Sequence, residues 1–175
     1  MPDDFRKILE DYQNRVYNQA YRMLGNAEDA EETTQDIFLK IYKKLEDFRG
    51  ESALSTWIYR ITSNECISRL RKKQLDTTSL DETNEPDGYS LADVIPDNAP
   101  DAGALLESNE AAEMIRDEVR RLPSTWAMAI SLYHFDDLSY DEIAEAMDTP
   151  RATVATYISR GRKQLTKQMV KFVSE

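Results

Sequence analysis

The chain has 175 residues, 41% of them hydrophobic and 31% charged, so it can bury one large core or two small ones. Its net charge of −11 argues at first against a nucleic-acid-binding protein, and its single cysteine, Cys66, excludes an intramolecular disulfide. The sequence has no signal-like N-terminus and no apolar run of the roughly 20 residues that a membrane span needs. We therefore expect a soluble cytoplasmic protein without membrane insertion.

Apolar residues at helical spacing predict three helices before residue 74. The second is expected to begin near Ala27, with acidic residues favourably placed against the dipole of its first turn. A cap at Ser52 or Ser55 is expected to open the third. Connections this short predict an antiparallel helical bundle, which we assign to residues 1–73.

The end of this predicted bundle is basic. Residues 49–73 carry six basic side chains against two acidic ones, and they include Trp57 and Tyr59. Trp57 could pack in the core, or it could stack on an unpaired base, since base–aromatic stacking contributes about 1–3 kcal/mol per base. Arg60 and Asn64 lie a turn apart and could reach a phosphate and a base edge.

A segment without lysine or arginine extends from Gln74 to Ile115, and its first part combines proline and glycine with acidic residues. Low hydrophobicity and high net charge predict a flexible acidic linker, which we assign to residues 74–104. Its apolar cluster could dock elsewhere on the molecule, or the linker could be a solvated tether with no further role. The cluster consists of Leu91, Val94 and Ile95.

Residues 105–175 are expected to form a second domain of about four helices. Ser124 is expected to cap one of them, and Ser139 with Glu142 fits a capping box at the start of another. Thr149 is expected to cap the last helix, with Pro150 in its first helical position. The fold class is therefore all-α, with two small helical domains.

The last two helices, within residues 138–167, have the form of a helix-turn-helix. Residues 151–175 carry six basic side chains against one acidic, and phosphates respond to this local potential rather than to the total charge. Asp148 falls in the turn, whose geometry aspartate tolerates. The alternative is an ordinary helical hairpin that packs on a core.

Catalytic, metal and cofactor sites are not expected. His134, the single histidine, ends an apolar helix, and no serine or cysteine motif accompanies it. Cys66 has no second cysteine or paired histidine that could complete a zinc site. The sequence therefore does not predict an enzyme.

Three motifs, in order along the chain, resemble the extracytoplasmic-function RNA polymerase sigma factors. They are AEDAEETTQDIFLKIYKKLEDF, FRGESALSTWIYRITSNECISRLRKK and LSYDEIAEAMDTPRATVATYISRGRKQL. The resemblance implies a factor that binds core RNA polymerase and reads the minus-ten and minus-thirty-five promoter elements, in opened and duplex DNA respectively. It also implies contacts with the β′ clamp helices and the β flap, a linker in the RNA exit path, and control by an anti-sigma factor.

The resemblance also implies site residues. Those for polymerase docking are Gln35, Asp36 and Phe38. Those for the minus-ten element are Phe48, Arg49, Gly50, Ser52, Trp57, Arg60 and Asn64. Those for the minus-thirty-five element are Arg151, Thr153, Thr156, Arg160, Arg162 and Lys163, with Thr156 and Arg160 facing bases and Arg162 and Lys163 near phosphates.

The chain departs from the family pattern in the last motif. Ala155 stands where many members carry lysine or arginine, and Arg151 could supply that charge one turn earlier. The bases that the chain prefers at the minus-thirty-five element are therefore not predicted. Two other functions are weighed: a helix-turn-helix regulator that is not a polymerase subunit, and a helical adaptor that binds only protein. The regulator leaves the motifs within residues 27–73 unused, and the adaptor leaves both basic blocks as solvated faces.

Overall fold

The computed structural model describes residues 3–77 and 109–174. Within these ranges the chain forms α-helices joined by short turns, with no β-strand, which confirms the all-α prediction. The predicted linker, apart from its first residues, lies outside the described residues, as does its apolar cluster.

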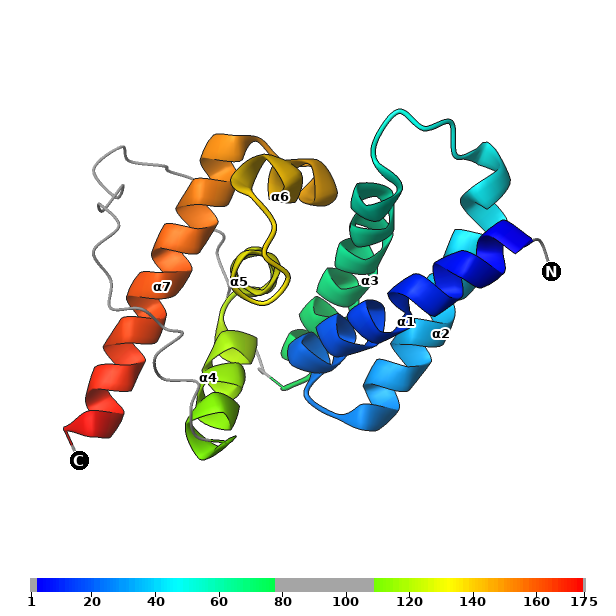
Figure 1. The fold of residues 1–175 in the computed structure, drawn as a ribbon. Coiled ribbons are helices and arrows are strands. Elements are labelled where there is room, and N and C mark those ends of the chain that lie inside the picture. The colour runs from blue at the N-terminus through cyan, green and yellow to red at the C-terminus, as the bar shows by residue number, and fades with distance from the viewer. Residues whose placement is uncertain (1–2, 78–108, 175) are drawn as a thin grey trace.

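Three helices form the N-terminal half (Figure 1). They are α1 (Asp3–Leu24), α2 (Ala27–Lys44) and α3 (Leu54–Thr77), and the short 3-10 helix η1 (Leu45–Asp47) follows α2. Asn26 caps α2 by accepting a hydrogen bond from the backbone N–H of Asp29 at 2.8 Å, which confirms the predicted start. Because α3 begins at Leu54 and the Ala53 carbonyl accepts its first hydrogen bond, neither Ser52 nor Ser55 is at the N-cap, and the helix continues past Lys73 to Thr77.

Four helices form the C-terminal half, and the last two make the predicted helix-turn-helix. The four are α4 (Asn109–Arg121), α5 (Ser124–His134), α6 (Tyr140–Met147) and α7 (Arg151–Val173). The capping box is confirmed: Ser139 Oγ accepts from the Glu142 N–H at 3.2 Å, and Glu142 Oε2 accepts from the Ser139 N–H at 2.7 Å. Asp148 ends α6 in the left-handed conformation, with φ 50°.

Two predicted caps are wrong, and for the same reason. Pro150 and Pro123 occupy the N-cap positions of α7 and α5, with ψ near 140°. The Pro150 carbonyl accepts the first hydrogen bond of the helix, from Thr153 at 3.0 Å, which needs no N–H on proline. Thr149 instead donates its hydroxyl to the Met147 carbonyl, and Ser124 is the first residue of α5.

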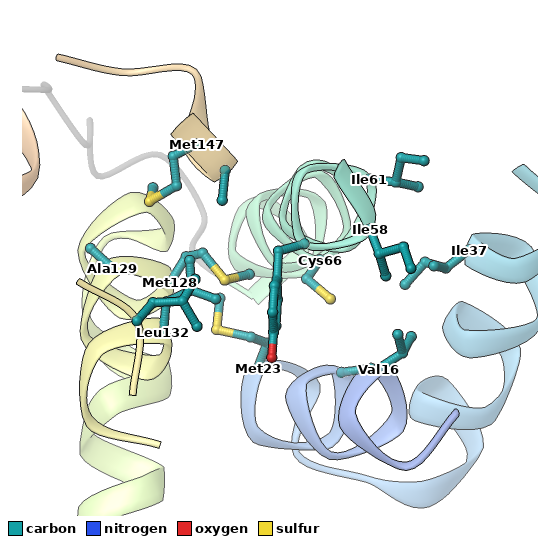
Figure 2. Close-up of a cluster of buried hydrophobic side chains, with 14 of the residues drawn as sticks. Val16, Met23, Ile37, Ile58, Ile61, Cys66, Met128, Ala129, Leu132 and Met147 are labelled. Atoms are coloured by element: carbon teal, nitrogen blue, oxygen red, sulfur yellow. The ribbon is translucent and has the colours of Figure 1, made fainter. Parts of the chain in front are cut away.

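The two halves pack against each other. Helix α3 lies against α6 and α5, and α1 lies against α5 and α4. Figure 2 shows Met23 of α1 beside Met128 and Leu132 of α5, and these three side chains are fully buried. Burial of this apolar surface holds the described helices in one arrangement.

Gly161 allows α7 to approach α5 closely. A Cβ at this position would lie 2.3 Å from Ile130 Cδ1, well inside van der Waals contact. Both residues are buried, so the space cannot be regained by a movement toward solvent. The second helix of the helix-turn-helix therefore depends on a glycine in its middle, although glycine lowers helix stability by about 1 kcal/mol relative to alanine.

We expect Gly161→Ala to destabilise the protein by about 1 kcal/mol, because overpacking costs about 1–3 kcal/mol and the gain in helix propensity offsets only part of it. Urea unfolding measures the change. In an Ile130→Val background, which lacks the clashing methyl group, Gly161→Ala should become neutral or stabilising. Equal destabilisation in both backgrounds would show that the clash is not the cause.

Candidate nucleic-acid interface

An aromatic pair joins the loop after η1 to the first turn of α3. The rings of Phe48 and Trp57 have centroids 4.9 Å apart and planes tilted by 37°. Both side chains are half-buried, while Arg49 and Gly50 in the loop are exposed. Gly50 has φ 71°, a conformation that favours glycine, and no atom would crowd a Cβ there. Trp57 thus belongs partly to the core and partly to an accessible aromatic surface.

Arg60, one turn after Trp57, points across to the other half of the molecule. Its Nε and Nη2 donate to the backbone carbonyl of Glu145 at 3.2 and 3.0 Å. This carbonyl lies in the last turn of α6, where the helix dipole favours a cation, and it also accepts from the Asp148 N–H at 3.3 Å. Asn64, one turn further along α3, is exposed, and Ser52 is half-buried. The structure thus brings the predicted strand-contacting arginine onto the helix-turn-helix.

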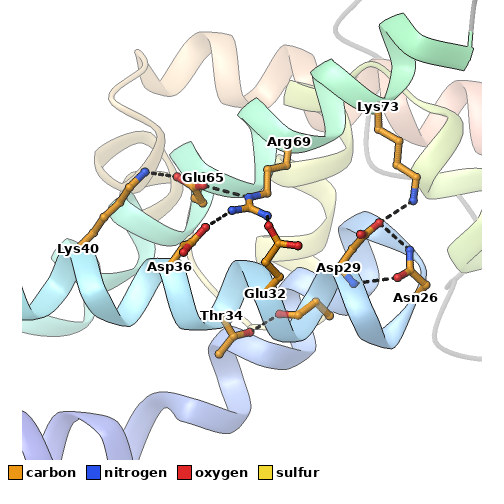
Figure 3. A network of polar contacts seen from close by, with 10 residues as sticks. Asn26, Asp29, Glu32, Thr34, Asp36, Lys40, Glu65, Arg69 and Lys73 are labelled. Atoms are coloured by element: carbon orange, nitrogen blue, oxygen red, sulfur yellow. Dashed lines mark hydrogen bonds and ion pairs between the residues drawn. The ribbon is translucent and has the colours of Figure 1, made fainter.

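Ion pairs join α2 to α3 (Figure 3). Arg69 of α3 pairs with Asp36 and with Glu32 of α2, and it donates to Glu65 on its own helix at 3.0 Å. Lys40 of α2 pairs with Glu65 from the other side. Asp36 therefore has a cationic partner within the chain, while its side chain keeps 43% of its surface exposed.

The other two predicted residues on α2 lie in different environments. Gln35 is exposed, whereas Phe38 is 6% exposed and belongs to the core. Leu39 follows on the outer face of α2 and is 55% exposed, a residue that the motif comparison did not single out. The apolar spacing of this helix includes Phe38 and not Leu39 and so indicates the core for Phe38, whereas the family motif alone places Phe38 at the docking surface.

The polar contacts between α2 and α3 lower the pKa of two carboxyl groups. Burial by itself raises the pKa of Glu65, but hydrogen bonds from Lys40 and Arg69 outweigh this effect, and the net pKa is lowered. Hydrogen bonds from Asn26 and Lys73 likewise lower the pKa of Asp29. Both carboxylates therefore stabilise the folded chain in their ionised form.

The exposed face of α7 is opposite its buried stripe of Val154, Ile158 and Gly161. Thr153, Thr156 and Arg160 are half-buried, and Lys163 is exposed. The Thr156 hydroxyl donates to the Ala152 carbonyl at 3.0 Å and so keeps its acceptor lone pairs.

Two arginines of α7 are held by aromatic rings. Arg151 lies 5.6 Å from the ring centroid of Tyr140 and pairs with Asp141 at 3.1 Å. Arg162 lies 5.2 Å from the ring centroid of Tyr133, and its Nε donates to His134 Nε2 at 3.2 Å. Arg162 thus points toward α5. These rings could not be predicted from the sequence, because helical spacing does not reveal contacts between helices.

Catalytic and metal-binding arrangements are not found among the described residues. No group of three potential metal ligands occurs there. Cys66 is buried, and burial raises the pKa of its thiol to about 12, so it is not an activated nucleophile. No helix in the described part of the chain is long and apolar enough to cross a membrane.

Known proteins and protein families match nearly the whole chain. The family profile Sigma-70 region 2 matches residues 8–75, and the profile Sigma-70, region 4 matches residues 112–165. The chain is 34% identical to the ECF RNA polymerase sigma factor SigW of Bacillus subtilis, over 95% of this chain and 89% of the relative. It is 32% identical to the ECF RNA polymerase sigma-E factor of Escherichia coli, over 94% and 86%.

A solved structure shares the fold. The sigma factor RpoE of Bartonella quintana, in complex with the anti-sigma factor NepR, matches with a TM-score of 0.66 at 21% identity, over 96% of this chain and 98% of that one.

We expect the ion-pair network to weaken in acid. Because the pKa of Glu65 is lowered below its ordinary value of 4.5, its contribution to stability is present above that pH and is lost as the pH falls through the folded-state pKa. The free energy of unfolding, measured between pH 7 and pH 3, should therefore fall less steeply in Glu65→Gln than in the unsubstituted protein. Parallel pH profiles would contradict this assignment.

Proposed function

The chain belongs to the extracytoplasmic-function RNA polymerase sigma factors, and we propose that it binds core RNA polymerase and directs initiation from a specific set of promoters. Such proteins are transcription initiation factors rather than enzymes. The observation that carries the proposal is the order of the two region matches, together with identity above 30% over nearly the full length. We take residues 1–73 and 105–175 as the two functional domains and residues 74–104 as their linker.

The outer face of α2 is proposed to dock on the β′ clamp helices of the polymerase. Gln35 and Leu39 are exposed, and Asp36 offers a carboxylate in an ion pair that an external cation could join. Phe38 supports this face from within the core rather than contacting the partner. Arg69 would hold the Asp36 carboxylate in a fixed position, and an oriented carboxylate loses less conformational entropy when a second cation binds.

The surface from Phe48 to Asn64 is proposed to read the minus-ten element. Capture of a flipped base costs a few kcal/mol of unstacking, and a pocket must replace the lost stacking. The Phe48–Trp57 pair supplies an aromatic surface, and Arg49, Gly50 and Ser52 supply a cation and backbone donors beside it. Arg60 and Asn64 extend this surface along α3.

Helix α7 is proposed to enter the major groove at the minus-thirty-five element. Arg160 and Thr156 lie on its outer side, and Arg151 and Thr153 lie in its first turn, the part of a recognition helix that reaches base edges. Lys163 would contact phosphate. Arg162, which lies over Tyr133, would contact phosphate only at the edge of the groove.

The proposed partners also include an anti-sigma factor and the β flap, and the proposed location is the cytoplasm. Support for an anti-sigma partner comes from RpoE, a sigma factor solved in complex with the anti-sigma factor NepR, and a second similar structure is CnrH in complex with the cytosolic domain of CnrY. CnrH matches with a TM-score of 0.64 at 19% identity. A duplex-binding regulator that is not a polymerase subunit would use α6 and α7 but would leave the exposed α2 face without a role.

Transcription in vitro with purified core polymerase tests the function. The protein should bind core and direct initiation from genomic promoters, whereas Asp36→Asn should weaken core binding at least tenfold, since a charge-assisted contact contributes about 1.5–3 kcal/mol. Glu32→Gln is the matched control, because it removes another carboxylate from Arg69. Equal losses in both variants would assign Asp36 a structural role, and no initiation by the unsubstituted protein would refute the function.

Base readout by α7 can be separated from phosphate contact. Arg160→Ala should cost about 1–3 kcal/mol and relax the preference at one base pair of the minus-thirty-five element. Lys163→Ala should weaken binding evenly across sequences and reduce the slope of log K against log salt by about 1. Promoter libraries and salt titrations measure these effects. An unchanged base preference in Arg160→Ala would place the readout elsewhere on α7.

A further inference from the structure

We propose that Tyr140 and Asp141, the first two residues of α6, position the Arg151 side chain and so take part in the choice of the minus-thirty-five sequence. The inference rests on the proposed entry of α7 into the major groove. Arg151 is the first residue of α7, and its guanidinium lies 5.6 Å from the ring centroid of Tyr140. Its Nε pairs with Asp141 Oδ1 at 3.1 Å. The first side chain of the recognition helix is thus oriented by the other helix of the motif.

Arg151 stands at a helix end where a cation is disfavoured. The dipole of α7 concentrates partial positive charge at its N-terminus, and the first turn contains no acidic residue. Arg151 therefore lowers the intrinsic stability of α7, and departures from such local preferences concentrate at functional sites. Because the N-terminal residues of a recognition helix contact base edges, this departure agrees with a role of Arg151 in DNA contact.

The Tyr140 ring is itself fixed. It is half-buried and packs edge-on against Tyr133 of α5, with ring centroids 5.2 Å apart and planes at 63°. The capping box formed by Ser139 and Glu142 holds the backbone around it. A ring held in this way gives the guanidinium a preferred location, because the face of an aromatic ring attracts cations. A guanidinium that is placed beforehand loses less conformational entropy when it binds DNA.

Asp141 and the phosphates of DNA compete for Arg151. The ion pair lies on the surface, with side chains 65% and 81% exposed, so it contributes little to the stability of the fold. The carboxylate holds the Nε edge of the guanidinium, whose fork has further N–H groups for a second acceptor. The same negative charge repels the phosphates of every sequence alike. Asp141 therefore favours contact of Arg151 with a base edge over contact with the backbone.

The test uses the full chain in complex with core polymerase and a promoter library randomised at the minus-thirty-five element. Tyr140→Leu should reduce discrimination about two- to fivefold at the base pair whose preference Arg151→Ala alters, which is the factor expected for loss of an exposed cation–π contact. Tyr140→Phe keeps the ring face and should keep the preference. Urea unfolding of each variant measures whether the fold is retained.

A second pair of variants tests the carboxylate. Asp141→Asn should lower discrimination at the same base pair and raise affinity for duplex DNA of unrelated sequence, because it removes both the partner of Arg151 and a charge that repels phosphate. Asp137→Asn is the matched control. Asp137 lines the same surface hollow as Arg151 and Tyr140 but is not part of the ion pair, and asparagine tolerates its φ of 56°. This control should leave the base preference unchanged.

A double-mutant cycle shows whether the α6 residues act through Arg151. In an Arg151→Ala background, Tyr140→Leu and Asp141→Asn should cause no further change in base preference, since the side chain that they position is absent. A loss of the same size in both backgrounds would overturn the positioning role, because the two residues would then act on α6 or on DNA directly.

The other outcomes separate the positioning role from the proposed function. The role is overturned if Tyr140→Phe loses as much discrimination as Tyr140→Leu, or if Tyr140→Leu weakens binding evenly across all sequences. It is also overturned if Arg160→Ala changes the base preference while Arg151→Ala does not, and recognition by α7 then stands. If the unsubstituted protein directs no initiation from any promoter, the proposed function has failed instead.

Discussion

The contact between the two halves is the constraint on which the rest of the described structure depends, and the ion pair between Arg22 and Asp136 lies within it. The two side chains are only 15% and 8% exposed, and burial raises the pKa of the Asp136 carboxyl although Arg22 opposes this effect. Removal of one partner from a buried pair costs about 3–5 kcal/mol, because the other charge stays buried.

The two proposed surfaces of the N-terminal half, on α2 and on α3, differ in how exposed they are. Helix α2 packs on α1 and α3, and its outer face with Gln35 and Leu39 stays exposed. Helix α3, by contrast, is covered by α6 near Arg60. The proposed docking face is therefore accessible in this arrangement, whereas part of the proposed minus-ten surface, at Arg60, contacts α6.

Helix positions and most of their ends could be predicted from the sequence, because apolar spacing and caps act over a few residues. The capping box at Ser139 and the turn at Asp148 are examples. The errors at Thr149 and Ser124 arose where a proline took the N-cap through its carbonyl. The family motif places Phe38 among the docking residues, but the packing of α2 buries its ring in the core, as the apolar spacing of this helix indicates.

The sequence by itself determined the all-α class, the helix-turn-helix and the segregation of positive charge into residues 49–73 and 151–175, because each depends on local spacing and composition. Only the tertiary structure decided that Arg60 caps α6, that Arg22 crosses to Asp136 and that Gln19 lies buried against Met128. These contacts join residues 85 to 114 positions apart. They depend on how two packed halves meet, and no periodicity within one helix carries that information.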